Sequence, residues 1–510
     1  MRPPLLLGAD IEVPCVDGRR RRYVNLDYAA STPVMADVWA AVEAFVPWYS
    51  SVHRGSGAKS QVSTAAFEDA RDTVGRFVGA HADDTVVFVA NTTEAINVLS
   101  AALPAGTRVL SSAVEHHSNM LPWRHHDLRL LPFSGSQDEL LDACERALRS
   151  ARPPIDLVAI TGPSNVTGEV WPIAELAELA HAHGAQLLVD AAQLAPHRPI
   201  DMTGAGIDFL ALSGHKLYAP FGVGALVGGA RRLRAREPLL HGGGTIELVT
   251  PDDVIWADAP HRHEAGSPNV VGAVALAAAC RALRGLGMDN VAAHEQALSA
   301  RLWSALEAIA GLHRLTLWPD TAERVGVATF NLDRYRHPLL AAILSAEHAI
   351  GVRHGCFCAH PLITRLLGVP DHQINRLAAE LRAGRRPALP GAVRASIGLG
   401  TTPHDIDRLI DALRDIADTG PRSRYRYSDR LDEYHPEPRR LTTNAHADAH
   451  PTGQPRERIG TRPDDAARAP RARIGKPRAA DARQMTTTTS GRSSSTRGVP
   501  GADRGPRIDV

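Results

Sequence analysis

A lysine and an aspartate, each following an apolar run, are the residues of this chain best suited to chemistry. Lys216 ends the sequence Ser213-Gly214-His215-Lys216 after the apolar run 207–212, and Asp190 ends the earlier run 185–189. If the runs are neighbouring strands, both side chains lie at one end of a sheet. The amine can form a Schiff base there and the carboxylate can keep a pyridine nitrogen protonated, which suits pyridoxal phosphate. A surface lysine beside an unrelated core aspartate is the alternative.

A helix start supplies a candidate phosphate site. Asn91-Thr92-Thr93-Glu94 follows an apolar run and opens an expected helix over 95–102. Free backbone N–H groups and the helix dipole favour an anion at such a position. Asn91 with Glu94 three residues later is also typical of a capping box, so a well-capped helix is the alternative. With Lys216 and Asp190 present we favour phosphate binding, by Thr92, Thr93, Ser213 and His215.

Three further polar side chains lie where a ring and a substrate would need them. His116 follows a short strand and can stack on a cofactor ring, and Asn165 in a loop after another strand can hydrogen-bond a ring hydroxyl. Arg394 lies in the strand-like segment 392–396 and can bind an amino-acid carboxylate with two parallel bonds. The alternatives are a polar loop histidine, an asparagine that stabilises its own turn and an internal salt bridge.

Two cysteines one residue apart form a second candidate centre. They lie in Gly355-Cys356-Phe357-Cys358, within what we name the cysteine loop, residues 352–361. No second Cys/His pair follows at zinc spacing, so we expect no metal site. An accessible thiolate attacks electrophilic sulfur well, which predicts a sulfur substrate. Two buried structural cysteines are the alternative.

The elements that must position these residues are continuous apolar runs separated by helical stretches. Such runs predict an α/β fold with a mainly parallel sheet buried on both faces. A last core helix begins at Thr402-Pro403, which supply a cap and a first-turn proline. The runs that we expect to be strands are 85–90, 108–110, 157–161, 187–189 and 209–212.

The composition bounds the class of protein. The chain has 510 residues, 44% of them hydrophobic and 22% charged, with a net charge of +1, so no global electrostatic argument favours nucleic acid or an anionic membrane. The longest apolar stretch, 270–280, is too short to span a bilayer. Five sparse cysteines fit a reducing compartment, and we expect a cytoplasmic protein. After Gly420 large apolar residues become rare, which predicts a mostly disordered polar tail over 421–510.

Eight segments in order resemble the class V aminotransferase branch of the fold-type I pyridoxal phosphate enzymes, over residues 24–420. They are most similar to SUF-type (group II) cysteine desulfurases and selenocysteine lyases. The segments are Leu26–Ser31, Val52–Gly55, Glu115–Asn119, Ser164–Gly168, Asp190–Gln193, Ser213–Lys216, Glu264–Asn269 and Arg353–Ala359. The resemblance implies a large domain with a mainly parallel seven-stranded sheet between helices and a smaller α+β domain. The implied divisions are 1–25 (joining the small domain), 26–270 (large) and 271–420 (small).

The resemblance also implies roles for single residues. Lys216 carries the cofactor, His116 lies on the ring face, and Gln193 and Asn165 lie near the ring hydroxyl. Cys358 matches the cysteine that forms a persulfide. Ser267 matches a position that reaches the phosphate of the partner subunit, which implies a homodimer. The residues implied at the substrate are Ala30, His53, Asn165, Arg353 and Arg394.

Two features depart from the desulfurase pattern. Cys356 and Phe357 stand where the family commonly has histidines, and 368–391 is an insertion. Both resemble molybdenum-cofactor sulfurases. We therefore expect a desulfurase that converts L-cysteine to alanine and a Cys358 persulfide, with a sulfur-acceptor protein as partner. A molybdenum-cofactor sulfurase and a pyridoxal phosphate lyase or epimerase acting on another small amino acid are the alternatives.

Overall fold

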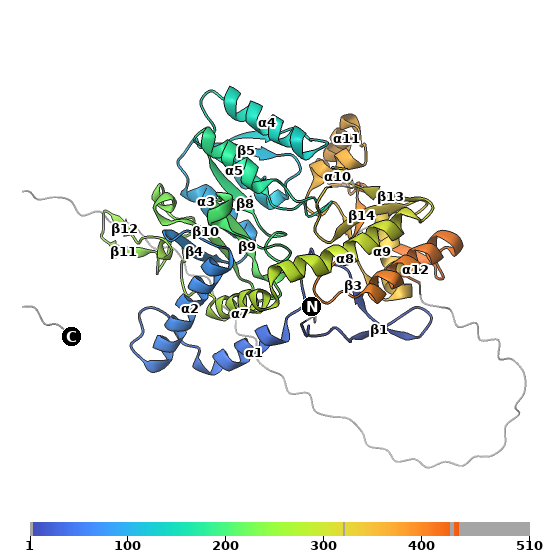
Figure 1. Cartoon of the computed structure of the whole chain (residues 1–510), viewed down its shortest axis with the longest axis horizontal. Coiled ribbons are helices and arrows are strands. Elements are labelled where there is room, and N and C mark those ends of the chain that lie inside the picture. The colour runs from blue at the N-terminus through green and yellow to red at the C-terminus, as the bar shows by residue number, and fades with distance from the viewer. Residues whose placement is uncertain (1–3, 320–321, 429–432, 438–510) are drawn as a thin grey trace, which may run out of the picture. The chain divides into compact units, whose positions relative to one another are not determined.

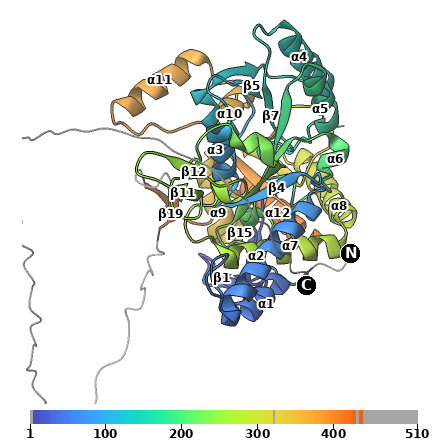
Figure 2. The same cartoon turned by 90° about the vertical axis from the view of Figure 1, so that its left-hand side faces the viewer.

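The computed structural model describes residues 4–319, 322–428 and 433–437 of the chain. Residues 1–441 form one compact unit, shown in Figures 1 and 2. None of its described helices is by itself long and apolar enough to cross a membrane, although α7 (Val270–Leu286) and α8 (Met288–Glu307) together pass that test of length and composition despite a 76° bend.

A seven-stranded sheet lies at the centre of the larger part of this unit (Figure 1). The strand order is β4-β10-β9-β8-β7-β5-β6, and β10 alone runs antiparallel to its neighbours. The mainly parallel seven-stranded sheet predicted from the sequence is thereby confirmed. The strands are β4 Asp84–Val89, β5 Arg108–Ser112, β6 Asp127–Leu131, β7 Leu157–Thr161, β8 Gln186–Asp190, β9 Phe209–Ser213 and β10 Gly224–Gly229.

Alternate side chains of these strands enter two different hydrophobic clusters. Val86 and Phe88 belong to one cluster, whereas Val87 and Val89 belong to the other. Because the side chains of a strand alternate between faces, the sheet is buried on both sides and its strands read as continuous apolar runs. The second cluster includes α3 (Thr92–Ala102). Helices that contribute to the first cluster include α1 Ala36–Phe45, α2 Ala58–Phe77, α4 Gln137–Ser150, α5 Ile173–Ala182 and α7.

A smaller antiparallel sheet has the order β13-β14-β17-β16 and its own cluster. The strands are β13 Leu312–Leu315, β14 Val327–Leu332, β16 Arg353–Gly355 and β17 Ala392–Ser396. The helices of that cluster are α8, α9 His337–His348 and α12 Pro403–Thr419. As predicted, α12 begins with a Thr402 cap and a first-turn proline, and the cap is completed as a capping box by Asp405. Near the N-terminus β3 (Val24–Asn25) pairs with β15 (Ile350–Gly351), which ties the first residues to this part.

The predicted domain boundary at residue 270 falls at the start of α7 and stays a prediction. Helix α7 follows that boundary, yet it packs on α1 and α2 and fills the cluster of the larger sheet with small apolar side chains. Contacts also do not separate 26–270 from 271–420, because both lie in one compact unit. The insertion 368–391 forms α11 (Asp371–Arg382), which has no buried residue and lies beyond α10 (His360–Leu366) at the rim of the molecule (Figure 2).

The predicted disorder of 421–510 is wrong for its first residues. Strands β18 (Tyr425–Ser428) and β19 (Glu433–Pro436) pair as an antiparallel hairpin. The Tyr425 hydroxyl donates to Glu347 at 2.9 Å, and the Arg336 guanidinium lies 5.2 Å from the centre of the Tyr427 ring. A few tyrosines thus anchor a segment whose average composition is polar. The rest of the predicted tail, 438–510, lies outside the described residues.

Candidate active site

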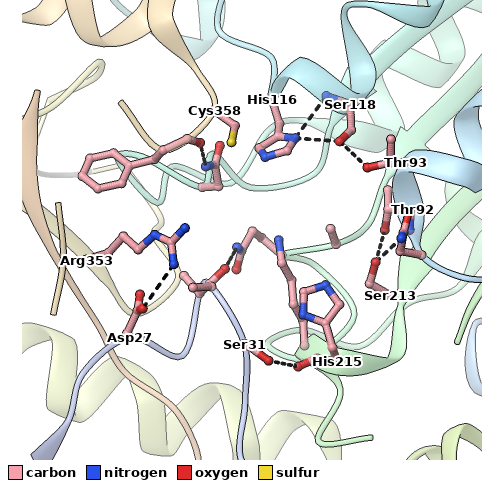
Figure 3. A pocket seen from close by; sticks show the side chains of 18 of the residues that line it. Asp27, Ser31, Thr92, Thr93, His116, Ser118, Ser213, His215, Arg353 and Cys358 are labelled. Carbon is pink, nitrogen blue, oxygen red and sulfur yellow. Dashed lines mark hydrogen bonds and ion pairs between the residues drawn. The ribbon is translucent and has the colours of Figure 1, made fainter. Parts of the chain in front are cut away.

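One cavity of about 740 Å³ gathers most of the residues that the sequence singled out (Figure 3). It lies where the ends of β8 and β9 and the start of α3 face the cysteine loop and β17 of the smaller sheet. Ligands of open α/β sheets bind outside the carboxyl ends of the strands, as here. The predicted site residues that line it are Ala30, Thr92, Thr93, His116, Asn165, Asp190, Gln193, Ser213, His215, Lys216, Arg353, Cys358 and Arg394.

Lys216 and Asp190 lie in this cavity because each follows one of two neighbouring strands, as predicted. Strands β8 and β9 are parallel neighbours, so Asp190 at the end of β8 and the turn Gly214–Lys216 after β9 lie at the same edge. Burial lowers the pKa of Lys216 to about 8, although the nearby Asp190 opposes the shift. Burial also raises the pKa of Asp190, whose Oδ1 accepts the backbone N–H of Ala192 at 3.0 Å. A neutral, nucleophilic amine is therefore accessible near neutral pH.

The lowered pKa of Lys216 predicts how the apoprotein takes up an aldehyde. Only a neutral amine attacks a carbonyl, so the rate of pyridoxal phosphate attachment should rise about tenfold per pH unit and level off above a pH of about 8. Rapid-mixing absorbance measurements between pH 6 and 10 would follow the attachment. Nα-acetyl-lysine is the control, since its rate should keep rising towards pH 10. A protein rate that also rises unchanged to pH 10 would contradict the lowered pKa.

Hydroxyl groups gather at the start of α3. Thr92 donates its backbone N–H to Ser213 Oγ at 2.8 Å, and its own hydroxyl lies 2.8 Å from the same atom. The Thr93 hydroxyl lies 2.6 Å from Ser118 Oγ. Asn91 accepts the Glu94 N–H at 3.1 Å, so the predicted helix cap is present, and the same helix start lines the cavity as the candidate phosphate site. Ser118 was missed from the sequence, because no spacing signal pairs it with a residue 25 positions earlier.

His116 is held as a neutral ring. Its Nδ1 accepts the backbone N–H of Ser118 at 3.1 Å and lies 3.0 Å from the Ser118 hydroxyl. Burial and the nearby Lys216 lower the pKa of His116 to about 3. A neutral imidazole presents a flat apolar face to the cavity, as stacking on a ring requires.

The donors and acceptors of the cavity fit pyridoxal phosphate. Gln193 donates Nε2 to the Ala29 carbonyl at 2.7 Å, and its buried Oε1 has no partner among the described residues. A buried acceptor left unsatisfied calls for a ligand donor, such as a ring hydroxyl. Lys216 matches an aldehyde, Asp190 a ring nitrogen and the hydroxyls at α3 a phosphate. The residues present therefore fit each polar group of the cofactor.

The sequence allows two roles for Arg394, a substrate-carboxylate ligand and a partner in an internal salt bridge. It is 3% exposed, its Nη2 lies 3.3 Å from Asp27 Oδ1 and its Nη1 donates to the Asn165 carbonyl at 2.8 Å. Its guanidinium carbon lies 4.9 Å from the centre of the Phe357 ring. Burial lowers its pKa to about 10. The internal salt bridge exists, and the same arginine lines the cavity. Sequence reasoning missed Asp27, which is 367 positions from Arg394.

The cysteine loop closes one side of the cavity. Cys358 is exposed and lines the cavity, whereas Cys356 is half-buried and lies against the large hydrophobic cluster. Asn165 donates one Nδ2 N–H to the Phe357 carbonyl at 2.8 Å, which leaves its Oδ1 and its second Nδ2 N–H for a cofactor hydroxyl. Arg353 is exposed at the rim, 3.8 Å from Asp27.

Two predicted residues lie outside this cavity. His53 and Ser267 line a second cavity of about 560 Å³, where His53 pairs with Glu68 at 2.9 Å. Within one chain they therefore do not join Lys216, which lines the first cavity. Their predicted roles at a phosphate and a substrate stay predictions.

Comparison with known proteins agrees with this geometry. The aminotransferase class-V family model matches residues 24–409. A cysteine desulfurase of Klebsiella pneumoniae (strain 342) is 35% identical over 413 residues, which is 79% of this chain and 94% of the relative. A cysteine desulfurase of Dickeya dadantii is also 35% identical, over 79% of this chain and 93% of its own length.

Two solved structures have the same fold. The apo structure of a cysteine desulfurase from Thermococcus onnurineus NA1 superposes with a TM-score of 0.68 at 29% identity, covering 78% of this chain and 94% of that one. A cysteine desulfurase from Escherichia coli, crystallised as an S-sulfonic acid, superposes with a TM-score of 0.65 at 30% identity, covering 77% of this chain and 94% of that one.

Proposed function

The chain belongs to the class V aminotransferase family of pyridoxal phosphate enzymes, and from this premise we propose that it removes sulfur from L-cysteine. The products are L-alanine and a persulfide on Cys358. The observation that carries the proposal is that an exposed thiol, a buried arginine and a lysine of lowered pKa line one cavity. Relatives that cover most of the chain and are named cysteine desulfurase support it.

The chain's own residues divide the work. Pyridoxal phosphate, when bound, supplies a ring that stores the charge left on Cα after a proton is removed. Lys216 Nζ removes and returns that proton, and the Asp190 carboxyl lies where it can hold the ring nitrogen. His116 covers the ring and excludes water from that face. The hydroxyls at the start of α3 hold the phosphate.

Arg394 and Cys358 act on the substrate. Arg394 binds the carboxylate of L-cysteine, since its guanidinium lines the cavity and offers parallel donors. The Cys358 thiolate attacks the substrate sulfur, so an S–S bond forms and the substrate C–S bond breaks. Cysteine and the Cys358 thiol thereby become alanine and Cys358–S–SH, with the electron pair of the C–S bond and a proton left on the alanine carbon.

The test is to measure the alanine that the cofactor-loaded protein releases from L-cysteine with a reductant present. L-selenocysteine and L-serine serve as parallel substrates. Alanine from cysteine supports the proposal. Turnover of serine or racemisation of cysteine without alanine would instead favour a lyase or an epimerase and overturn it.

We further infer a homodimer. Large apolar side chains are exposed around the second cavity and on the neighbouring hairpin of β11 (Ile246–Val249) and β12 (Val254–Trp256). Contiguous exposed apolar surface is typical of an interface. His53 and Ser267 line the second cavity and not the one that contains Lys216. In a dimer, they could contact a cofactor bound beside Lys216 of the partner chain. Light scattering that gives the mass of one chain would contradict the inference. The exposed apolar residues are Trp48, Tyr49, Leu248, Val249 and Ile255.

The persulfide needs an acceptor. Cys358 is exposed at the mouth of the cavity, which supports transfer of its outer sulfur to a thiol of a second protein. All five cysteines are free, as a reducing compartment would keep them, and we propose the cytoplasm. Radioactive sulfur from labelled cysteine, followed from Cys358 to a candidate acceptor, would test the transfer.

A further inference from the structure

The segment that carries Cys358 has an unusual backbone. Phe357 and Cys358 have φ angles of +52° and +55°, so two consecutive residues with side chains occupy the left-handed region. Residues other than glycine rarely adopt this region, and they keep it only where the surrounding structure fixes them. The contacts of this segment therefore decide where the Cys358 thiol lies.

Three successive carbonyls of the segment are fixed by hydrogen bonds. The Cys356 carbonyl accepts the Ala359 N–H at 2.9 Å and the Phe357 carbonyl accepts the Asn165 amide at 2.8 Å. The Cys358 carbonyl accepts the backbone N–H of His117 at 2.7 Å. This last bond ties the thiol-bearing residue to the neighbour of His116, the ring-face histidine.

His117 also holds the helix that follows. Helix α10 begins at His360 after Ala359, which has no side chain able to cap it. His117 Nε2 accepts the backbone N–H of His360 at 3.3 Å, so a residue from elsewhere in the chain acts as the missing cap. The two imidazoles stack with ring centres 5.1 Å apart and planes 9° apart, and His360 Nδ1 lies 3.4 Å from His117 Nε2.

We propose that His117 and His360 form a clasp that positions the Cys358 thiol and holds the cysteine loop closed only while the His117 imidazole is neutral. His117 fixes the loop on both sides of Ala359: its backbone at Cys358 and its side chain at His360. The clasp rests on the proposed role of Cys358, and it makes His117 a positioning residue rather than a group that touches the substrate.

The proton state of the clasp follows from its bonds. Nε2 of His117 must offer a lone pair to the His360 N–H, so the proton of the neutral ring lies on Nδ1. A protonated His117 would lose that acceptor and put a positive charge at a helix N-terminus beside His360. The His116 ring centre lies 6.4 Å from that of His117, and Cys358 is joined to the His117 backbone. No carboxylate pairs with either imidazole among the described residues.

The pKa shifts of the two imidazoles determine how closure of the loop depends on pH. Burial, and for His117 also the nearby His360, lowers the pKa of both imidazoles below the ordinary 6.5. A histidine with a lowered pKa in the folded state stabilises the closed loop fully above pH 6.5, and this stabilisation is lost as the pH falls through the lowered value. The loop should thus open on the acid side of neutrality.

The test compares His117→Ala, which removes the acceptor, with His117→Gln, whose side-chain oxygen can accept the same N–H without titrating. Hydrogen exchange of residues 353–361, corrected for intrinsic rates, would be measured on the cofactor-loaded protein between pH 5 and 8, without substrate. At pH 7.5 we expect about tenfold less protection in the alanine variant and near-normal protection in the glutamine variant. The glutamine variant should also lose the fall in protection that the wild type shows below pH 6.5.

Kinetics supply the second readout. His117→Ala should lower kcat for alanine formation about tenfold at pH 7.5 with little change in KM, since a displaced thiol impairs attack and not binding. His372→Gln, at an exposed position of α11, is the matched control and should behave as the wild type. Two results would overturn the proposed clasp. One is hydrogen-exchange protection in His117→Ala equal to that of the wild type. The other is a loss of protection below pH 6.5 in His117→Gln as large as in the wild type. Because exchange is read without substrate, this result stands even if L-cysteine proves not to be the substrate.

Discussion

Replacing Cys358 by alanine should abolish persulfide formation and lower alanine release from L-cysteine by at least about 100-fold, because the variant has no thiol to attack the substrate sulfur. Cys358 is the one exposed cysteine of the five, and it lines the same cavity as Lys216 and Arg394. Cofactor absorbance should be unchanged, since the Cys358 side chain makes no hydrogen bond to the described residues of the cavity. Mass spectrometry of the protein after one turnover would show whether an extra sulfur is present.

Cys356→Ala is the matched control for that prediction. Cys356 is half-buried and packs against the large hydrophobic cluster, and it does not line the cavity. This variant should keep the persulfide and most of the alanine release. If persulfide still accumulates in Cys358→Ala but not in Cys356→Ala, the two cysteines have exchanged roles and the assignment of the nucleophile is wrong.

The sequence predicts those parts of the site that depend on local order. Lys216 and Asp190 each follow a strand, and parallel strands present their carboxyl ends at one edge, so their proximity could be inferred from two apolar runs. The start of α3 was predictable for the same reason: capping residues after a strand mark where helix N–H groups face the sheet edge.

The remaining contacts of the site depend on how distant segments pack. Asp27 meets Arg394, and Asn165 meets Phe357 across 192 positions, through side chains that no periodicity links. The pairing of β18 with β19 could not be predicted, because their tyrosines are sparse in a polar stretch. Glu347 on α9 and Arg336 just before that helix stabilise these strands. His53 and Ser267 match family positions, but they line the second cavity. A motif match alone does not say whether such residues contact a cofactor in their own chain or in a partner chain.

Lys216→Ala should eliminate covalent attachment of pyridoxal phosphate and lower alanine formation by about 100-fold to 10,000-fold, which is the usual range for loss of a positioned acid or base. The chain makes this prediction unusually easy to check, because it has only three lysines, Lys59, Lys216 and Lys476. Borohydride reduction of the wild-type holoprotein should leave the cofactor on the peptide that contains Lys216.

Lys59 provides the matched control, since it lies in the first turn of α2 and does not line the cavity. A neutral amine at pH 7 to 8 requires the lowered pKa that burial gives Lys216. Lys59→Ala should therefore retain both the label on Lys216 and full activity. Label distributed over several lysines, or activity that survives Lys216→Ala, would mean that the cavity does not activate this amine, and the mechanism would need another base.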